Sequence, residues 1–247
     1  VVGNSLRQVI GYDRYGSRLW TLPVAEVPTG LTAAGNDVLV STGDGRLAKV
    51  SLGSGAVGWT RDLGAEASPQ VTVLPGAVVC IDAHQNLQAM RLSDGQPLWD
   101  TSDRQARQVV SLLDGTVVEG DSRMLVGRSA ASGEPWWQVD VRGQLERLWP
   151  SGRNLVVSTN LEVSALDRRG VTLWRTDRKE LVSVSGEFAF LGNRNTAELR
   201  RVVDGAVLGR WRYDKPVSYL KSALITPRGV FGSLQPAGES TTFVEWA

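Results

Sequence analysis

Short runs of apolar residues, separated by polar turns, follow one another along the whole chain. Residues 70–74 read QVTVL, a Pro-Gly pair follows, and residues 77–82 read AVVCID. The same order returns at 147–159, as RLWP, the turn SGRN and then LVVST. Apolar runs of about four to eight residues, bounded by Gly, Pro, Asn, Asp or Ser, are typical of β-strands. Since no stretch of ten or more residues keeps a helical period with caps, we predict an all-β chain.

Tryptophan marks a repeat in this pattern. The segments VIGYDRYGSRLW (9–20) and VSALDRRGVTLW (163–174) align without a gap, each with a short strand, an Asp, a Gly and then a Trp four residues later. Periods of 20 to 50 residues are typical of solenoids and propellers. Seven of the nine tryptophans follow one another at intervals of 39, 40, 38, 37, 37 and 35 residues: Trp20, Trp59, Trp99, Trp137, Trp174, Trp211 and Trp246.

Each full repeat closes with a predicted hairpin. At the turn glycine we expect the positive φ that a tight hairpin requires, because glycine adopts it without a steric cost. With two more strands upstream of every hairpin, the unit is a four-stranded antiparallel sheet of about 38 residues. The turn glycines are Gly55, Gly95, Gly133, Gly170 and Gly205.

Four-stranded units of this length predict a β-propeller, because a single sheet cannot cover both its faces and must stack on its neighbours. We expect one domain over 1–247 with seven (or six) blades, and partial blades at 1–22 and 217–247. One indole per blade then fills the gap to the next blade, which contributes at most about 4–6 kcal/mol each. The predicted structural blade anchors are Trp20, Trp59, Trp99, Trp137, Trp174 and Trp211.

Two tryptophans stand outside the series and are candidate partner contacts. Trp136 directly precedes the anchor Trp137, so on a regular strand its side chain points to the opposite face. Trp149 precedes Pro150 in a turn-rich stretch. Exposed aromatic side chains on one rim are typical of a protein contact. Packing of Trp136 on the other neighbouring blade is the alternative.

The reactive residues indicate no catalytic centre. Cys80 is the only cysteine and is expected in a buried strand, while His84 is the only histidine and is expected in a turn. A metal site or a catalytic triad needs further ligands or a nearby nucleophile, so we predict no catalytic, metal-binding or cofactor-binding residue. The scattered aspartates are expected to bond the backbone of turns. They are Asp44, Asp82, Asp94, Asp114, Asp121, Asp167 and Asp204.

The charge balance bears on partners. Lys and Arg exceed Asp and Glu by 27 − 26 = 1, which argues against nucleic-acid binding. The sequence contains no run of 18 apolar residues, so it predicts no membrane-spanning helix. Basic doublets at Arg168–Arg169, Arg178–Lys179 and Arg200–Arg201 are expected in solvated turns, and a positive patch that faces a partner or anionic lipid is the alternative.

The repeat resembles that of the pyrroloquinoline-quinone (PQQ) type β-propellers, over nearly the whole chain. Five residues match that repeat fully: Ala165, Leu166, Asp167, Gly170 and Trp174. Another five match with small changes: Gly11, Tyr12, Asp13, Gly16 and Trp20. Within this family the chain is similar to the non-catalytic, BamB-like branch of outer-membrane assembly factors. Members of that branch usually have eight blades, whereas this chain supplies about six and a half repeats.

The resemblance implies a non-catalytic, protein-binding scaffold of the bacterial cell envelope, with protein partners in an envelope complex. It implies a periplasmic or extracytoplasmic location, tethered to a membrane through a segment outside this sequence. One alternative is an extracellular ligand-sensing ectodomain of a larger membrane protein. The other is a PQQ-dependent dehydrogenase or a glycan-active enzyme. The quinoprotein family carries an adjacent Cys pair, which a single cysteine cannot form, so we expect no cofactor.

Overall fold

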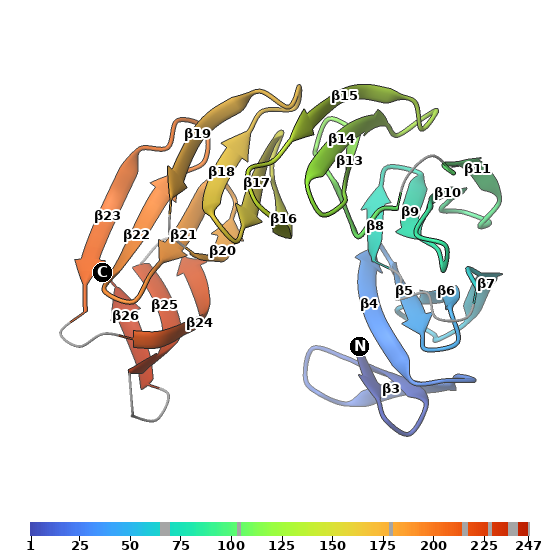
Figure 1. Cartoon of the computed structure of the whole chain (residues 1–247). Helices are drawn as coiled ribbons and strands as arrows, with labels where there is room; N and C mark the ends of the chain where they lie inside the picture. Colours follow the sequence, from blue (N-terminus) through green and yellow to red (C-terminus); the bar gives the residue numbers. More distant parts are fainter. Residues whose placement is uncertain are drawn as a thin grey trace. The chain divides into compact units, whose positions relative to one another are not determined.

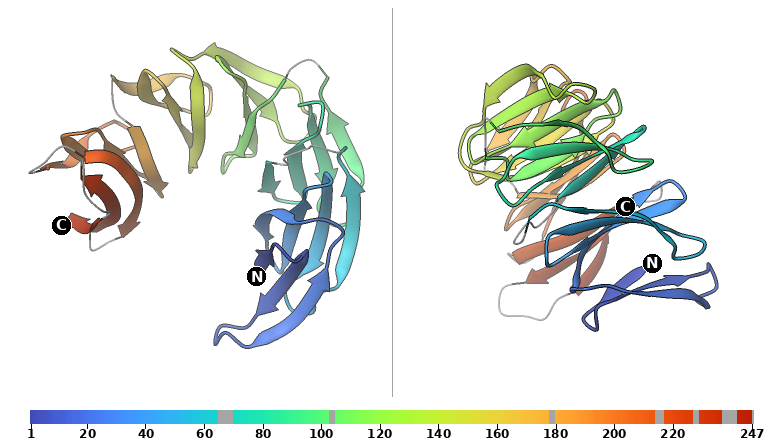
Figure 2. Two further views of the ribbon diagram at one scale, coloured as in Figure 1. Left: turned by 60° about the horizontal axis from the view of Figure 1, so that its bottom comes forward. Right: turned by 90° about the vertical axis from the view of Figure 1, so that its right-hand side faces the viewer.

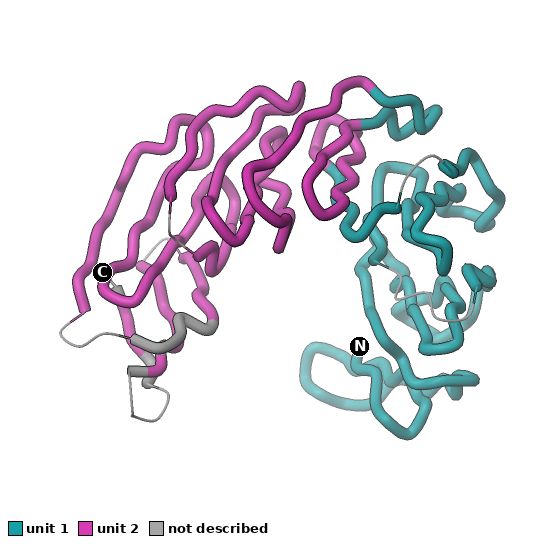
Figure 3. Tube along the Cα trace, in the orientation of Figure 1, with its two compact units in different colours: residues 1–111, 128–135 teal, residues 112–127, 136–247 magenta. Residues whose placement is uncertain are grey.

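The computed structural model of the chain describes residues 1–64, 70–102, 105–177, 180–213, 217–226, 229–236 and 242–246. In these residues the chain forms 26 strands and no helix (Figure 1), so the prediction of an all-β chain is confirmed. The chain divides into two compact units (Figure 3). Unit 1 comprises Val1–Ser111 and Arg128–Pro135, and unit 2 comprises Leu112–Gly127 and Trp136–Ala247.

Unit 1 holds three antiparallel sheets, each made of consecutive strands. The first consists of β1 (Val2–Asn4), β2 (Gln8–Tyr12) and β3 (Arg18–Pro23). The second consists of β4 (Pro28–Ala34), β5 (Asp37–Thr42), β6 (Arg46–Ser51) and β7 (Val57–Asp62). The third consists of β8 (Val71–Leu74), β9 (Ala77–Ile81), β10 (Leu87–Arg91) and β11 (Pro97–Asp100).

The fourth sheet has the same strand order and contains the boundary in the sequence between the two units. It consists of β12 (Gln108–Ser111), β13 (Thr116–Gly120), β14 (Met124–Ser129) and β15 (Pro135–Asp140).

Unit 2 continues with three more sheets of consecutive strands. The fifth sheet consists of β16 (Leu145–Ser151), β17 (Asn154–Thr159), β18 (Glu162–Leu166) and β19 (Thr172–Asp177). The sixth consists of β20 (Glu180–Ser185), β21 (Phe188–Gly192), β22 (Thr196–Arg201) and β23 (Val207–Arg212). The seventh consists of β24 (Val217–Thr226), β25 (Gly229–Pro236) and β26 (Thr242–Trp246).

The first and last sheets, blue and red in Figure 2, have three strands each among the described residues. Trp20 lies on the last strand of the first sheet, as Trp59 does in the second, so the first sheet lacks a counterpart of β4. The seventh sheet lacks a described counterpart of β23, the strand that closes the sixth. The described residues therefore form seven separate sheets, five of which have four strands.

The hairpin that joins the third and fourth strands has one geometry throughout. The turn glycines Gly55, Gly95, Gly133, Gly170 and Gly205 have φ between 70° and 79°, which confirms the predicted left-handed conformation. The ladder also shifts register just before the turn, for example between Ala165 and Leu166 in β18. A bulge of this kind increases the local twist of a strand pair.

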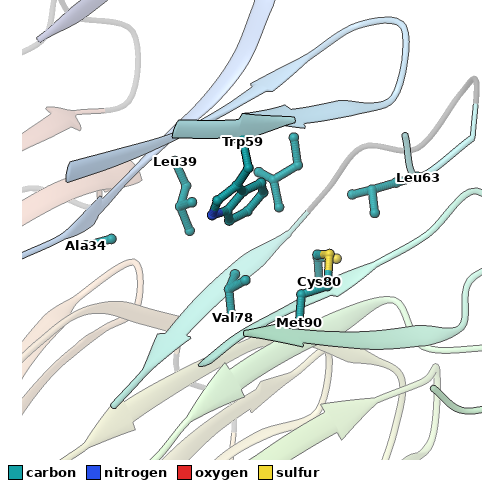
Figure 4. Packing of buried hydrophobic residues seen from close by; sticks show 8 residues of the cluster. Ala34, Leu39, Trp59, Leu63, Val78, Cys80 and Met90 are labelled. Atoms are coloured by element: carbon teal, nitrogen blue, oxygen red, sulfur yellow. The ribbon is translucent and has the colours of Figure 1, made fainter. Parts of the chain in front are cut away.

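The core of unit 1 lies between stacked sheets. Leu39 and Trp59 from the second sheet pack with Val78, Cys80 and Met90 from the third (Figure 4). Trp59 is only 8% exposed there. Strand β9 is buried at all five of its positions, so it presents buried side chains on both faces of the third sheet.

Unit 2 repeats this packing between its fifth and sixth sheets. One buried cluster joins two groups of residues: Val156, Val163 and Ala165 from the fifth sheet, and Ala189, Leu191 and Val202 from the sixth.

Candidate functional site

The six predicted anchor tryptophans all lie on the last strand of their sheets. For five of them, the indole Nε1 donates a hydrogen bond to a backbone carbonyl just beyond the third strand of the next sheet. The donor and acceptor pairs are Trp20–Leu52 (2.9 Å), Trp59–Leu92 (3.0 Å), Trp99–Ala130 (2.8 Å), Trp137–Arg168 (2.7 Å) and Trp174–Val202 (2.7 Å). The sixth, Trp211, packs on Phe190 with the ring centroids 6.0 Å apart. The energetic role of these indoles stays a prediction.

The turn glycines meet the same indoles. A Cβ atom added to Gly205 would lie 2.6 Å from Cγ of Trp174, and one added to Gly170 would lie 2.7 Å from Cε3 of Trp137. Gly55, Gly95 and Gly133 abut Trp20, Trp59 and Trp99 in the same way. Glycine in these turns therefore has two roles. It adopts positive φ, and its lack of a Cβ lets an indole from the preceding sheet approach closely.

The two tryptophans outside the series lie in different environments. Trp136 stands near the start of β15 and is 59% exposed. Trp149 lies in strand β16, is half-buried and packs against the cluster of the fifth and sixth sheets. The guanidinium of Arg147 lies 4.9 Å from the Trp149 ring centroid. Trp136 thus presents the larger accessible aromatic surface, and partner contact at either residue stays a prediction.

Cys80 and His84 lie where the pattern predicts. Cys80 is fully buried in β9, and His84 is exposed in the turn that follows. The turn is organised by Asp82, whose Oδ1 accepts hydrogen bonds from the backbone N–H groups of His84 at 2.8 Å and Asn86 at 2.9 Å. Cys80 is therefore part of the buried core, and the backbone of His84 is part of a turn that Asp82 holds.

Cys80 is expected to resist thiol reagents while the protein is folded. Burial, assisted by the nearby Asp82 carboxylate, raises the pKa of the thiol to about 12, so the reactive thiolate is scarce near neutral pH. We expect the native thiol to react with an aromatic disulfide reagent at least about 100-fold more slowly than the thiol of protein unfolded in guanidinium chloride. Equal rates in the two states would show that Cys80 is accessible.

Most of the predicted turn aspartates bond their own turns. Asp167 Oδ1 accepts from the backbone N–H groups of Arg169 at 2.8 Å and Val171 at 2.9 Å. The same type of bond is made by Asp82, Asp94, Asp114, Asp121 and Asp204. Asp44 differs, because it accepts a hydrogen bond from the Thr42 hydroxyl. The carboxylates thus shape the loops from which any binding surface is built.

A pocket of about 380 Å³ lies in unit 2 at the start of β15. We call it the Trp136 pocket. Its lining consists of Asp114 and Thr116 from the start of β13 and the turn before it, Trp136 and Trp137 from β15, and Arg168 and Arg169 from the β18–β19 turn. Nη1 of Arg168 lies 3.7 Å from Oδ2 of Asp114. The pocket brings aromatic surface, positive charge and a hydroxyl together.

The sequence pattern indicated part of this site. Trp136 departs from the repeat, and the doublet Arg168–Arg169 carries two positive charges in one turn. Thr116 and Asp114 carried no such signal, since a Thr or Asp beside a turn glycine is ordinary turn chemistry. Of the other doublets, Arg200–Arg201 pairs locally with Glu198 and Asp204. Arg178–Lys179 lies outside the described residues.

Within the described part of the chain, no group of three or more His, Cys, Asp or Glu side chains is placed to hold a metal ion. No helix there is both long and apolar enough to span a bilayer.

Comparison with known proteins supports the resemblance. Residues 7–118 match the family model described as "Outer membrane protein assembly factor BamB". The whole fold is similar to the crystal structure of BamB from Moraxella catarrhalis, with a TM-score of 0.65 and 16% identity over 99% of this chain and 80% of that one. A search of curated proteins finds no match. The chain therefore has a β-propeller fold, and its resemblance to the PQQ-type, BamB-like repeats is confirmed.

Proposed function

We propose that this chain is a non-catalytic scaffold of the bacterial cell envelope that binds protein partners in an envelope complex. The observation that carries the proposal is the match of residues 7–118 to the BamB family model, together with a fold similar to BamB over 99% of the chain. We further propose a periplasmic location with a membrane tether outside the sequence.

The geometry of the repeat supports a binding role. The strands and the Trp–Gly contacts form a frame whose turns are held by local hydrogen bonds, as in the Asp167 turn. Loops on a rigid frame are the usual place for recognition, because their residues change without disturbing the core. An accessible Trp beside arginines, as in the Trp136 pocket, has the composition of a protein-binding hot spot.

The proposal is tested by affinity purification of the full-length protein from native membranes after mild cross-linking. Mass spectrometry is expected to recover outer-membrane barrel-assembly components or another stable envelope complex. The control is an unrelated periplasmic protein with the same tag, expressed at the same level. Recovery of the tagged protein alone, in repeated preparations, would contradict the scaffold role.

A further inference from the structure

The residues of the Trp136 pocket depart from the repeat, and the strands and Trp–Gly contacts form in the other sheets without such residues. The residue before the anchor tryptophan is aliphatic, glycine or arginine in the other sheets: Leu19, Gly58, Leu98, Leu173 and Arg210. Only in the fourth sheet is it a second tryptophan, and only the next sheet places two arginines in the turn that faces it. Since the other hairpins form without these side chains, stability of the hairpin does not explain them.

Thr116 points to a ligand in this pocket. The residue is fully buried, and its hydroxyl makes no hydrogen bond among the described residues. A buried polar group without a partner is unfavourable, and such groups are uncommon in folded proteins. Since Thr116 is one of the residues that line the pocket, a ligand that moves the side chain enough to expose the hydroxyl would supply the missing acceptor atom.

The charges of the lining favour an anionic ligand. Arg168 and Arg169 outnumber Asp114 by one. Asp114 is engaged with the backbone N–H of Thr116 at 3.1 Å and with Arg168 at 3.7 Å. No ion pair involves the Arg169 guanidinium within the part of the chain that the structure describes. Arg169 is therefore available to a carboxylate, which guanidinium groups bind with favourable geometry.

The apolar surface next to these charges favours a peptide over a small free anion. Trp136 is 59% exposed, and Leu113, which precedes the lining residue Asp114 in the sequence, is 84% exposed. An isolated carboxylate would leave this apolar surface in water. A polypeptide that carries an acidic residue next to an aromatic or aliphatic one would cover it.

We propose that the Trp136 pocket docks an acidic segment of a partner protein. A Glu or Asp carboxylate of the partner accepts hydrogen bonds from Arg169 and the Thr116 hydroxyl, and a neighbouring apolar side chain packs on the Trp136 indole. This inference rests on the proposed scaffold function and names the chemistry of its partner.

The test measures fluorescence anisotropy of a labelled peptide, Gly-Glu-Glu-Phe-Glu-Glu, against the whole purified chain. We expect micromolar binding that weakens with added salt, and little binding of the same peptide with Gln in place of Glu. Trp136→Ala and Arg169→Glu should each weaken binding by at least about tenfold. Asp114→Asn should tighten it by about two- to fivefold, because it removes the negative charge of the lining and keeps a side-chain oxygen.

Thr116→Val separates a ligand contact from a structural role. The substitution keeps the shape and removes the unpaired hydroxyl, so the melting temperature should stay the same or rise while peptide binding weakens by about three- to tenfold. The matched control is Arg123→Glu, a charge reversal at an exposed residue in the β13–β14 turn, at the other end of strand β13. It should leave peptide affinity unchanged.

Several outcomes would overturn the inference. They are equal affinity of all variants, equal affinity for the Gln peptide, or binding to anionic lipid vesicles without binding to the peptide. Co-purification distinguishes this failure from failure of the scaffold function. If Trp136→Ala and Arg169→Glu recover the same partners as the wild-type chain, the docking site is wrong and the scaffold stands. If the wild-type chain recovers none, the scaffold function itself is wrong.

Discussion

Replacing Trp174 with alanine is expected to lower the free energy of unfolding by about 3–5 kcal/mol. The indole is half-buried and packs against the cluster between the fifth and sixth sheets, so its loss leaves a cavity. The substitution also removes the hydrogen bond to the carbonyl of the buried Val202, at 2.7 Å, and the contact with Arg200, whose Cζ lies 5.6 Å from the ring. Urea denaturation followed by far-UV circular dichroism measures the change.

The control for this prediction is Trp136→Ala, which removes the same side chain from an exposed position. Its cost should stay near 0.5 kcal/mol, roughly the range for surface substitutions. Trp174→Phe adds a finer comparison, because it keeps a ring but leaves the Val202 carbonyl without its donor, at a cost of about 1–3 kcal/mol. Equal losses for Trp136→Ala and Trp174→Ala would show that the series of indoles does not anchor the sheets.

Gly205→Ala is expected to destabilise the protein by about 2–5 kcal/mol, through two separate terms. The residue has φ of 71°, a conformation that costs an L-residue roughly 1–2 kcal/mol. Its new Cβ would also lie 2.6 Å from Cγ of Trp174, which forces the indole or the turn to move. Overpacking of this kind costs about 1–3 kcal/mol.

Gly186→Ala is the matched control for Gly205→Ala. Gly186 also has positive φ, 57°, but no atom other than those of its two chain neighbours lies within 4 Å of an added Cβ. Its substitution should therefore lower the free energy of unfolding only by the cost of a positive φ for alanine, about 1–2 kcal/mol. Thermal or urea unfolding of both variants gives the packing term as the difference. If the two glycines tolerate alanine equally well, the close approach of Gly205 to Trp174 has no energetic weight.

Local pattern was sufficient for the strands and turns. Short apolar runs bounded by turn residues predicted the strands around 70–82 and 147–159, because such runs are typical of strands that are buried in a sheet. The turn glycines were predictable for an equally local reason, since few residues other than glycine adopt positive φ at low cost. The partial blades expected at 1–22 and 217–247 rest on the same local pattern, and that division of the chain stays a prediction.

The candidate site was predictable only where it broke the repeat. Trp136 stood out against the residues that precede the other anchors, and Arg168–Arg169 against the charge of other turns. That these residues share a pocket with Thr116 could not be read from the pattern. The three elements that line the pocket are separated by about 20 to 50 residues and meet through the stacking of two sheets.

The amino-acid sequence by itself determined the repeat, the all-β fold and the conformation of its hairpins, because these depend on residues that are neighbours along the chain. Only the tertiary structure showed that each turn glycine, from Gly55 to Gly205, also faces the indole of the preceding sheet. Only the tertiary structure showed that the Thr116 hydroxyl is buried without a hydrogen-bond partner among the described residues, and that Thr116 shares a pocket with Arg169. Contacts between sheets depend on how the faces of the sheets stack. They join residues that are far apart in the sequence, so no single stretch of the chain reveals them.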